Sequence, residues 1–383
     1  MKKLIPITVI FLFFCAAACC TECIYVFAEG EPPQISAVSA IVIDGATGTV
    51  LYEKNAHSRQ FPASTTKIMT GLIALESDHD MKETVKVSEK AASAEGSSIY
   101  MEAGEKISFE DLIYALMLRS GNDSAVALAE YISGSAEEFA AEMNKKAAEL
   151  GAEDTNFVTV NGLHDDNHYT TAYDMALFAR EAMKNGDFRK IVASRYWNAS
   201  RDEDKFNYFY NKNKVLYQYE GGNGIKIGYT TTAGRCLVAS SQRNGMELIA
   251  VVFAAPDWFN DTYKLMDYVY ENYESTVLIK EGERLAAVNV ENGDKGHTWL
   301  VSDHDIVFPK RIGEEITVTF RVDADNSVTA PVSRGEQGGE IKIFSNGEEA
   351  GTDYVVFRED IRARDEEDGG FFNNLLALIT KNR

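Results

Sequence analysis

The chain has 383 residues and a formal net charge of −21, from 38 Lys and Arg against 59 Asp and Glu. Its composition, 45% hydrophobic and 25% charged, is that of a globular protein and excludes a disordered or fibrous chain. The excess of acidic residues excludes the basic surface that grips phosphate backbones, so we expect no nucleic-acid partner.

The first 28 residues have the pattern of a secretory signal peptide. Lys2 and Lys3 precede an apolar run over residues 4–18, and Ala28 offers a small-residue cleavage site. We therefore expect an exported protein; the alternative is an uncleaved N-terminal anchor. Cleavage after Ala28 would leave Cys236 as the only cysteine, within an apolar run that predicts a packed strand residue and no internal disulfide.

Strand patterns lie on both sides of a long helical block. Five segments are apolar and rich in β-branched residues: 38–43, 49–52, 225–230, 236–241 and 246–254. Asn244 and Gly245 join the last two as a hairpin. Between the two groups the hydrophobic period is helical, as at Leu112, Leu116 and Met117. This order predicts an α/β sandwich, an antiparallel sheet flanked by helices, in which the first and last strands meet.

The helix boundaries carry their own signals. Three capping-box pairs mark helix starts: Ser108 with Asp111, Ser135 with Glu138, and Thr171 with Asp174. Pro256 opens a further helix that runs to about residue 273. These signals predict helices on both sides of the second strand group.

The last part of the chain changes character. Short strands and Gly- or Asp-containing turns over 276–362 predict a small all-β domain. A charged linker then leads to an apolar stripe at helical spacing between Phe371 and Ile379. The stripe is too short to span a bilayer, so we expect residues 363–383 to form a linker and an amphipathic helix on the membrane surface. The alternative is that the helix packs on the β domain.

The segment with the clearest chemistry contains Ser64 and Lys67. Pro62 precedes an apolar helical run, which places Ser64 in the first turn and Lys67 on the same face at i+3. A neutral lysine can act as a base if burial or a second cation lowers its pKa, and Lys226 is the candidate for that cation. The alternative is a capping serine beside a solvated lysine.

Two further segments carry polar residues that could contribute to a catalytic site. Ser120 and Asn122 break the helical pattern, and Lys226 and Gly228 lie on a predicted strand. Taken singly, they are typical of a turn and of an edge strand.

A metal site is the competing hypothesis. His164 and His168 stand at i, i+4 with two carboxylates between them, a spacing that suits zinc on a helix. Gly162 and the Asp-Asp-Asn cluster instead predict a loop, so we expect a solvated loop or the rim of a substrate site, and no metal.

The three motifs in this order resemble the serine-type D-alanyl-D-alanine carboxypeptidases, the low-molecular-mass penicillin-binding proteins: Ser-x-x-Lys, a serine triplet ending in Asn, and a Lys-x-Gly strand. The likeness extends from about residue 33 to the end, with further matching runs at 46–52, 117–129 and 161–165. It implies a β-lactamase/transpeptidase-like sandwich at 33–275 and a small β-sandwich domain at 276–362.

The resemblance also implies an activity. Such an enzyme, at the outer face of the cytoplasmic membrane or in the cell wall, removes the terminal D-alanine from peptidoglycan stem pentapeptides and is acylated by β-lactams, without a cofactor. Ser64 would be the nucleophile, Lys67 its general base and Ser120 a proton relay. The substrate would be held by Asn122, Lys226, Gly228, Tyr229 and Thr230.

One position departs from the family pattern. Ile227 stands where Thr is commonest, so a hydroxyl for the substrate carboxylate is missing and turnover is expected to fall, unless Thr230 or Thr231 replaces it. The alternatives are a weakly active or non-catalytic penicillin-binding wall protein, a DD-endopeptidase, or a β-lactamase. We disfavour the last because no glutamate is identified that would drive deacylation.

Overall fold

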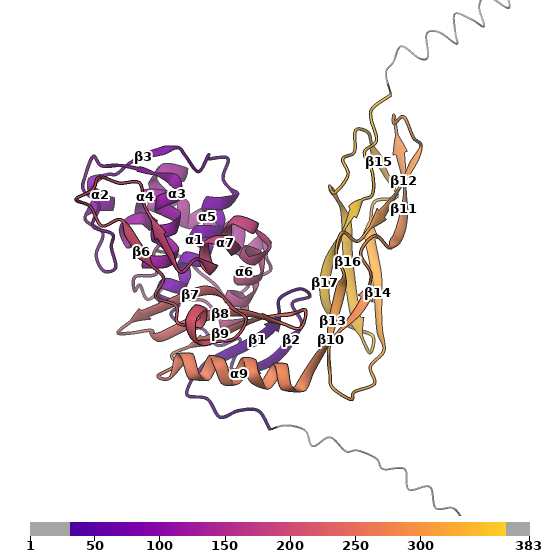
Figure 1. Ribbon diagram of the computed structural model, residues 1–383, viewed down its shortest axis with the longest axis horizontal. Helices are drawn as coiled ribbons and strands as arrows, with labels where there is room; N and C mark the ends of the chain where they lie inside the picture. Colours follow the sequence, from indigo (N-terminus) through magenta and orange to yellow (C-terminus); the bar gives the residue numbers. More distant parts are fainter. Residues whose placement is uncertain (1–30, 365–383) are drawn as a thin grey trace, which may run out of the picture. The chain divides into compact units, whose positions relative to one another are not determined.

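The computed structural model describes residues 31–364 (Figure 1). The predicted signal peptide, residues 1–28, and the predicted amphipathic helix within 363–383 lie outside the described residues. Within residues 31–364, no helix has the length and apolar character needed to cross a bilayer.

A five-stranded antiparallel sheet forms the centre of the N-terminal part. Its strands, in spatial order, are β2 (Val50–Lys54), β1 (Ser39–Asp44), β9 (Met246–Phe253), β8 (Gly234–Arg243) and β7 (Gly222–Thr230). Ile41 pairs with Val251, so the first and last strands of this part meet as predicted. Asn244 and Gly245 both have positive φ between β8 and β9, as a two-residue hairpin turn requires. The predicted sheet and hairpin are therefore confirmed.

Helices supply most of the chain between β2 and β7. They are α1 (Lys67–Glu76), α2 (Glu89–Ala92), α3 (Phe109–Tyr114), α4 (Asn122–Ser133), α5 (Ala136–Glu149), α6 (Ala172–Lys184), α7 (Gly186–Ala193) and α8 (Val215–Gln218). Two short pairs of strands accompany them: β3 (Thr84–Lys86) with β4 (Lys106–Ser108), and β5 (Tyr196–Asn198) with β6 (Tyr208–Tyr210). The side chains of Ser108, Ser135 and Thr171 each accept a hydrogen bond from the predicted backbone N–H. All three capping predictions are confirmed.

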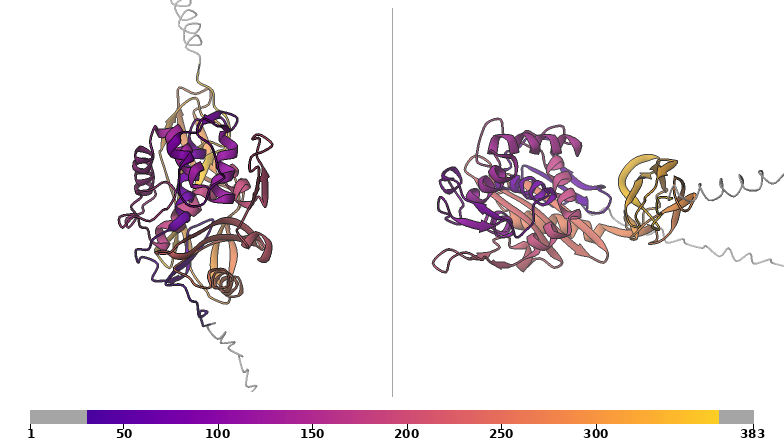
Figure 2. Two further views of the ribbon diagram at one scale, coloured as in Figure 1. Left: turned by 90° about the vertical axis from the view of Figure 1, so that its left-hand side faces the viewer. Right: turned by 90° about the horizontal axis from the view of Figure 1, so that it is seen from above.

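The sheet separates two apolar cores. Figures 1 and 2 show α1, α6 and α7 over one face and α9 (Trp258–Asn272) along the other. Along β1, Ile41 and Ile43 pack toward the helical block, whereas Ala40 and Val42 pack in the core that α9 covers. This alternation follows from the pleat of a strand that is buried on both faces.

The part that follows α9 is all β, as predicted. Strand β10 (Tyr273–Ile279) pairs with β13 (Ile306–Arg311). A six-stranded sheet has the order β14 (Val318–Ala324), β16 (Gln337–Ser345), β17 (Glu348–Phe357), β12 (His297–Val301), β11 (Arg284–Glu291) and β15 (Ser327–Thr329). Its own apolar cluster, which includes Leu300, Ile306, Ile341 and Ile343, gives this domain a separate core.

Candidate active site

Ser64 lies in a short 3₁₀ turn, η1 (Ala63–Thr66), that leads directly into α1. The turn opens with Ala63 in the left-handed region, at φ 48°. The Thr65 hydroxyl donates to the carbonyl of Pro62 at 2.7 Å, which stabilises the start of the turn. Ser64 itself is half-buried at the N-terminal end of α1, where the helix dipole favours a developing negative charge.

Lys67 is fully buried and sits one turn beyond Ser64. Its Nζ lies 3.1 Å from Ser64 Oγ, 2.7 Å from Asn122 Oδ1 and 2.6 Å from the carbonyl oxygen of Asn161. When the amine is neutral, the amide and peptide oxygens can accept its two hydrogens, and the nitrogen lone pair can accept a proton from the Ser64 hydroxyl. Burial, followed by the charge of Lys226, holds the pKa of Lys67 well below its usual value.

Lys226 supplies the second ammonium. It is 1% exposed on β7, and its Nζ donates to the carbonyl of Ile227 at 3.0 Å. Burial, with a smaller contribution from the charge of Lys212, lowers the pKa of Lys226 to about 7. In the part of the chain that the structure describes, neither Lys67 nor Lys226 has a carboxylate within ion-pair distance. The charge of Lys226 therefore disfavours the charged form of Lys67.

Ser120 and Asn122 enter the site from the break between two helices. The π-helical turn η2 (Ala115–Arg119) ends at Ser120, which takes the left-handed conformation at φ 62°. Ser120 Oγ is buried without a hydrogen-bond partner among residues 31–364. An unmade bond of this kind costs about 1–3 kcal/mol, which makes the hydroxyl available to an incoming group. Asn122 starts α4, and its side-chain amide also donates to the carbonyl of Glu95 at 2.6 Å.

Strand β7 closes the site against the turn that carries Ser64. A Cβ at Gly228 would lie 2.9 Å from the backbone nitrogen of Ser64, so only glycine allows this approach. Tyr229 is 62% exposed, and Thr230 Oγ1 accepts a hydrogen bond from the N–H of Ala233. Ile227 packs against the α9-side core, on the opposite side of β7 from Lys226 and Gly228.

The structure therefore brings together residues from four distant segments of the chain. Lys67 contacts Ser64 and Asn122, and the charge of buried Lys226 acts on Lys67. Ser120 stands two residues before Asn122, and Gly228 packs against the Ser64 turn. Tyr229 and Thr230 follow on the same strand. The carbonyl oxygen of Asn161 is an addition: residue 161 begins a run that resembles the family, but the sequence assigned it no role, because a backbone acceptor leaves no mark on residue identity.

The histidine pair corrects one prediction. His168 is 2% exposed, so the expectation of a solvated loop is wrong at this residue. Its Nδ1 accepts hydrogen bonds from the backbone N–H groups of Val158 and Thr159, and its Nε2 lies 2.8 Å from Thr66 Oγ1. His164 instead lies at the edge of the Phe61 ring. Among residues 31–364, no cluster of three or more His, Cys, Asp or Glu side chains is arranged to hold a metal.

Cys236 has no part in this chemistry. It is buried in β8, as predicted, and burial raises the pKa of its thiol to about 12. The thiol is therefore an inert packing group.

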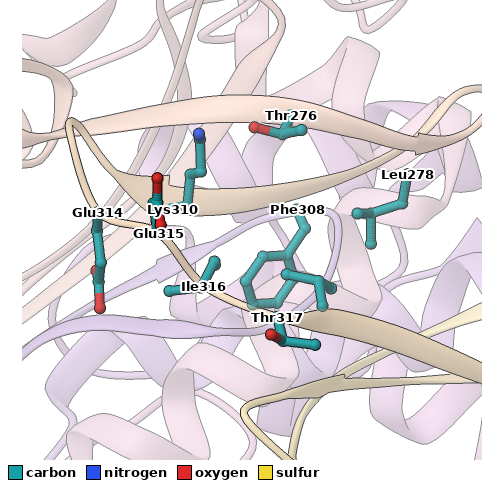
Figure 3. A pocket seen from close by; sticks show the side chains of 9 residues that line it. Thr276, Leu278, Phe308, Lys310, Glu314, Glu315, Ile316 and Thr317 are labelled. Atoms are coloured by element: carbon teal, nitrogen blue, oxygen red, sulfur yellow. The ribbon is translucent and has the colours of Figure 1, made fainter.

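A pocket of about 630 Å³ lies in the β domain, away from these residues (Figure 3). Strands β10 and β13 and the segment before β14 form its wall, with Leu278, Phe308 and Ile316 among the lining side chains. None of the candidate site residues lines it.

Family models match both parts of the chain. Residues 26–257 match the D-alanyl-D-alanine carboxypeptidase model, peptidase S11. Residues 273–363 match the model of the penicillin-binding protein 5 C-terminal domain.

Individual relatives agree with these matches. The D-alanyl-D-alanine carboxypeptidase DacF of Bacillus subtilis is 36% identical over 334 residues, which is 85% of this chain and 86% of DacF. DacC of Escherichia coli, with the same description, is 31% identical over 91% of this chain and 89% of its own length. The crystal structure of penicillin-binding protein 5 from Haemophilus influenzae superimposes with a TM-score of 0.66 at 29% identity, covering 86% of this chain and 99% of that one.

Proposed function

The chain belongs to the D-alanyl-D-alanine carboxypeptidase family and is a serine-type carboxypeptidase, and we propose that Ser64 and Lys67 carry out its reaction on the stem peptides of peptidoglycan. The observation that carries this proposal is the environment of the Lys67 amine. The amine is fully buried, its pKa is lowered by burial and by the charge of Lys226, and its nitrogen lies 3.1 Å from Ser64 Oγ.

Acylation begins with proton transfer from Ser64 Oγ to Lys67 Nζ. The oxygen attacks the carbonyl carbon of the penultimate D-alanine, and the carbonyl π electrons move onto oxygen. The backbone N–H groups of Ser64 and Tyr229 hold this oxyanion, a contribution of about 3 kcal/mol per donor.

Collapse of the tetrahedral intermediate expels the terminal D-alanine. The C–N bond breaks, and Ser120 relays the proton held by Lys67 to the leaving nitrogen. Its unpartnered hydroxyl suits this role because it can accept one proton while it donates another. Water then attacks the Ser64 ester with Lys67 again as the base, and the shortened peptide leaves.

Substrate binding uses the attraction between a positively charged lysine of the enzyme and the negatively charged carboxylate of the peptide. Lys226, helped by Thr230, attracts the terminal carboxylate, and Asn122 holds an amide of the peptide. Gly228 lets the peptide backbone approach β7. β-Lactams occupy the same positions and acylate Ser64, as the family's penicillin-binding members imply.

The comparisons favour a carboxypeptidase over a non-catalytic wall protein or a DD-endopeptidase, although Ile227 lacks the common hydroxyl. We further propose that residues 33–275 form the peptidase domain and 276–362 the β domain. Residues 1–28 direct export, and residues 363–383 hold the enzyme at the outer face of the cytoplasmic membrane, beside its cell-wall substrate.

The test is intact-mass spectrometry after incubation with benzylpenicillin, together with release of D-alanine from a synthetic stem pentapeptide. We expect one adduct per chain and D-alanine release, and the loss of both in Ser64→Ala. An adduct without release would identify a non-catalytic penicillin-binding protein. An adduct that persists in Ser64→Ala would place the nucleophile elsewhere.

A further inference from the structure

His168 lies between the Ser64 turn and a neighbouring backbone segment, residues 158–162. This segment touches α1 and its preceding turn at several points. The Thr70 hydroxyl donates to the carbonyl of Val160 at 2.6 Å, and Lys67 Nζ donates to that of Asn161. A Cβ at Gly162 would lie 1.9 Å from the carbonyl oxygen of Ala63. The imidazole of His168 connects the 158–162 segment to the Ser64 turn through its two ring nitrogens.

The hydrogen bonds to Nδ1 determine the tautomer of His168, and the tautomer determines the direction of the bond to Thr66. Nδ1 accepts from the N–H groups of Val158, at 2.9 Å, and Thr159, at 3.2 Å, so the proton of the neutral ring is on Nε2. Nε2–H then donates to Thr66 Oγ1, and the Thr66 hydroxyl donates to the carbonyl of Ala63 at 2.8 Å. One continuous chain of donors therefore runs from the 158–162 segment to Ala63.

The last acceptor in this series of hydrogen bonds, the Ala63 carbonyl, controls the direction of the Ser64 N–H. The carbonyl of Ala63 and the N–H of Ser64 belong to the same planar peptide group and point in opposite directions. A bond that fixes the carbonyl oxygen therefore fixes the direction of the Ser64 N–H. Ala63 has a left-handed φ of 48°, a conformation that is held by its surroundings and not by its own preference.

We propose that His168 is a positioning residue for the oxyanion hole: through Thr66 it orients the peptide that presents the Ser64 N–H, while its other nitrogen holds the segment whose carbonyl binds Lys67. The inference rests on the function proposed for Ser64. It assigns His168 no contact with substrate and no proton transfer.

The burial of the ring supports this role. His168 is 2% exposed, and burial lowers its pKa to about 4. A second proton on Nδ1 would face two backbone N–H groups. The ring is therefore neutral at neutral pH, and the donor chain stays intact.

Two substitutions separate the two ends of the imidazole. In His168→Asn, the side-chain oxygen can replace Nδ1 as the acceptor, but nothing reaches Thr66. In His168→Gln, the longer amide can donate to Thr66, and the acceptor for Val158 and Thr159 is lost. Thr66→Val removes the relay hydroxyl with little change in shape and leaves His168 in place.

The measurements are the first-order acylation rate constant and the noncovalent dissociation constant for benzylpenicillin. For His168→Asn and Thr66→Val we expect acylation to slow roughly ten- to a hundredfold, less than the 10²–10³ loss for complete removal of an oxyanion donor. The dissociation constant should stay within about twofold, because positioning acts on the transition state. His168→Gln should recover most of the acylation rate despite a lower melting temperature.

The double variant gives the decisive comparison. If both residues act through one chain, Thr66→Val with His168→Asn should acylate no more slowly than either single variant. Independent, multiplied losses, or a wild-type rate in folded Thr66→Val, would overturn the proposal. If His168→Asn does not fold, Thr66→Val alone decides between these outcomes. A wild-type chain that does not acylate at Ser64 would instead overturn the proposed function.

Discussion

The bases at the candidate active site and His304 of the β domain lie in opposite electrostatic environments. Lys67, Lys226 and His168 are buried with no carboxylate of residues 31–364 at ion-pair distance, and burial is the main cause that lowers the pKa of each. In the β domain, His304 is paired with Asp353 and Asp303, and the bond to Asp353 is the main cause that raises its pKa to about 9. Unpaired burial favours the neutral form of a base, whereas pairing with a carboxylate favours its charged form.

The pocket of the β domain shown in Figure 3 follows the paired pattern of His304. Its one ammonium, Lys310, pairs with Glu274 at 3.1 Å. Charged groups elsewhere in this domain follow the same pattern, as in the pair of Arg321 and Asp323. Exposed pairs of this kind contribute about 0–1 kcal/mol each to stability.

The largest effect should come from removing the buried base. Lys67→Met keeps the volume of the side chain and removes the amine, so acylation by benzylpenicillin should slow by about 10²–10⁴-fold, the usual contribution of a general base. Lys67→Arg is the matched control, because a guanidinium stays protonated and should be similarly slow. The time course of the mass adduct gives both rates. A near-wild-type rate in Lys67→Met would remove this lysine from the mechanism.

A smaller effect should appear in the pH dependence. The pKa of Lys226 is lowered to about 7, so its charge is lost as pH rises through 7, and with it the attraction for the substrate carboxylate. The value of kcat/KM for the wild-type chain should therefore fall on the alkaline side, by up to roughly tenfold per pH unit. Lys226→Arg keeps the charge and should move this limb to higher pH. If the pH profiles of kcat/KM for the wild type and Lys226→Arg coincide, Lys226 does not cause the alkaline decrease.

The smallest effect tests the β domain. The raised pKa of His304 stabilises the fold below pH 6.5, and this contribution is lost as pH rises through about 9. Because 40% of the side chain is exposed, screening reduces the contribution to about 1 kcal/mol or less. His304→Gln should lower the free energy of unfolding by that amount at pH 6, measured with urea, and leave penicillin acylation unchanged. A slower acylation would contradict the separation of the two regions.

Much of the fold could be predicted because its signals are local. The caps at Ser108, Ser135 and Thr171 depend on residues three apart, and the hairpin at Asn244 depends on two adjacent residues. The contact between Ser64 and Lys67 likewise follows from helical spacing.

The remainder depends on tertiary packing. The charge of Lys212, which contributes to the lowered pKa of Lys226, comes from a segment that the sequence pattern does not single out. The carbonyl of Asn161 is an acceptor that any residue would provide. His168 stands in a polar stretch of the sequence, which predicts exposure. In the folded chain it is buried and contacts Thr66. Sequence patterns identify side chains, but not the backbone groups or the solvent exclusion around them.

The pairing of β1 with β9 has a consequence for the time at which the enzyme becomes reactive. Until β9 and β8 are in place, β7 cannot bring Lys226 to the Ser64 turn, and Lys67 in a solvated chain is an ordinary protonated lysine. We therefore expect Ser64, the proposed nucleophile, to be unreactive in the nascent polypeptide. It should become reactive only when the late strands have completed the sheet.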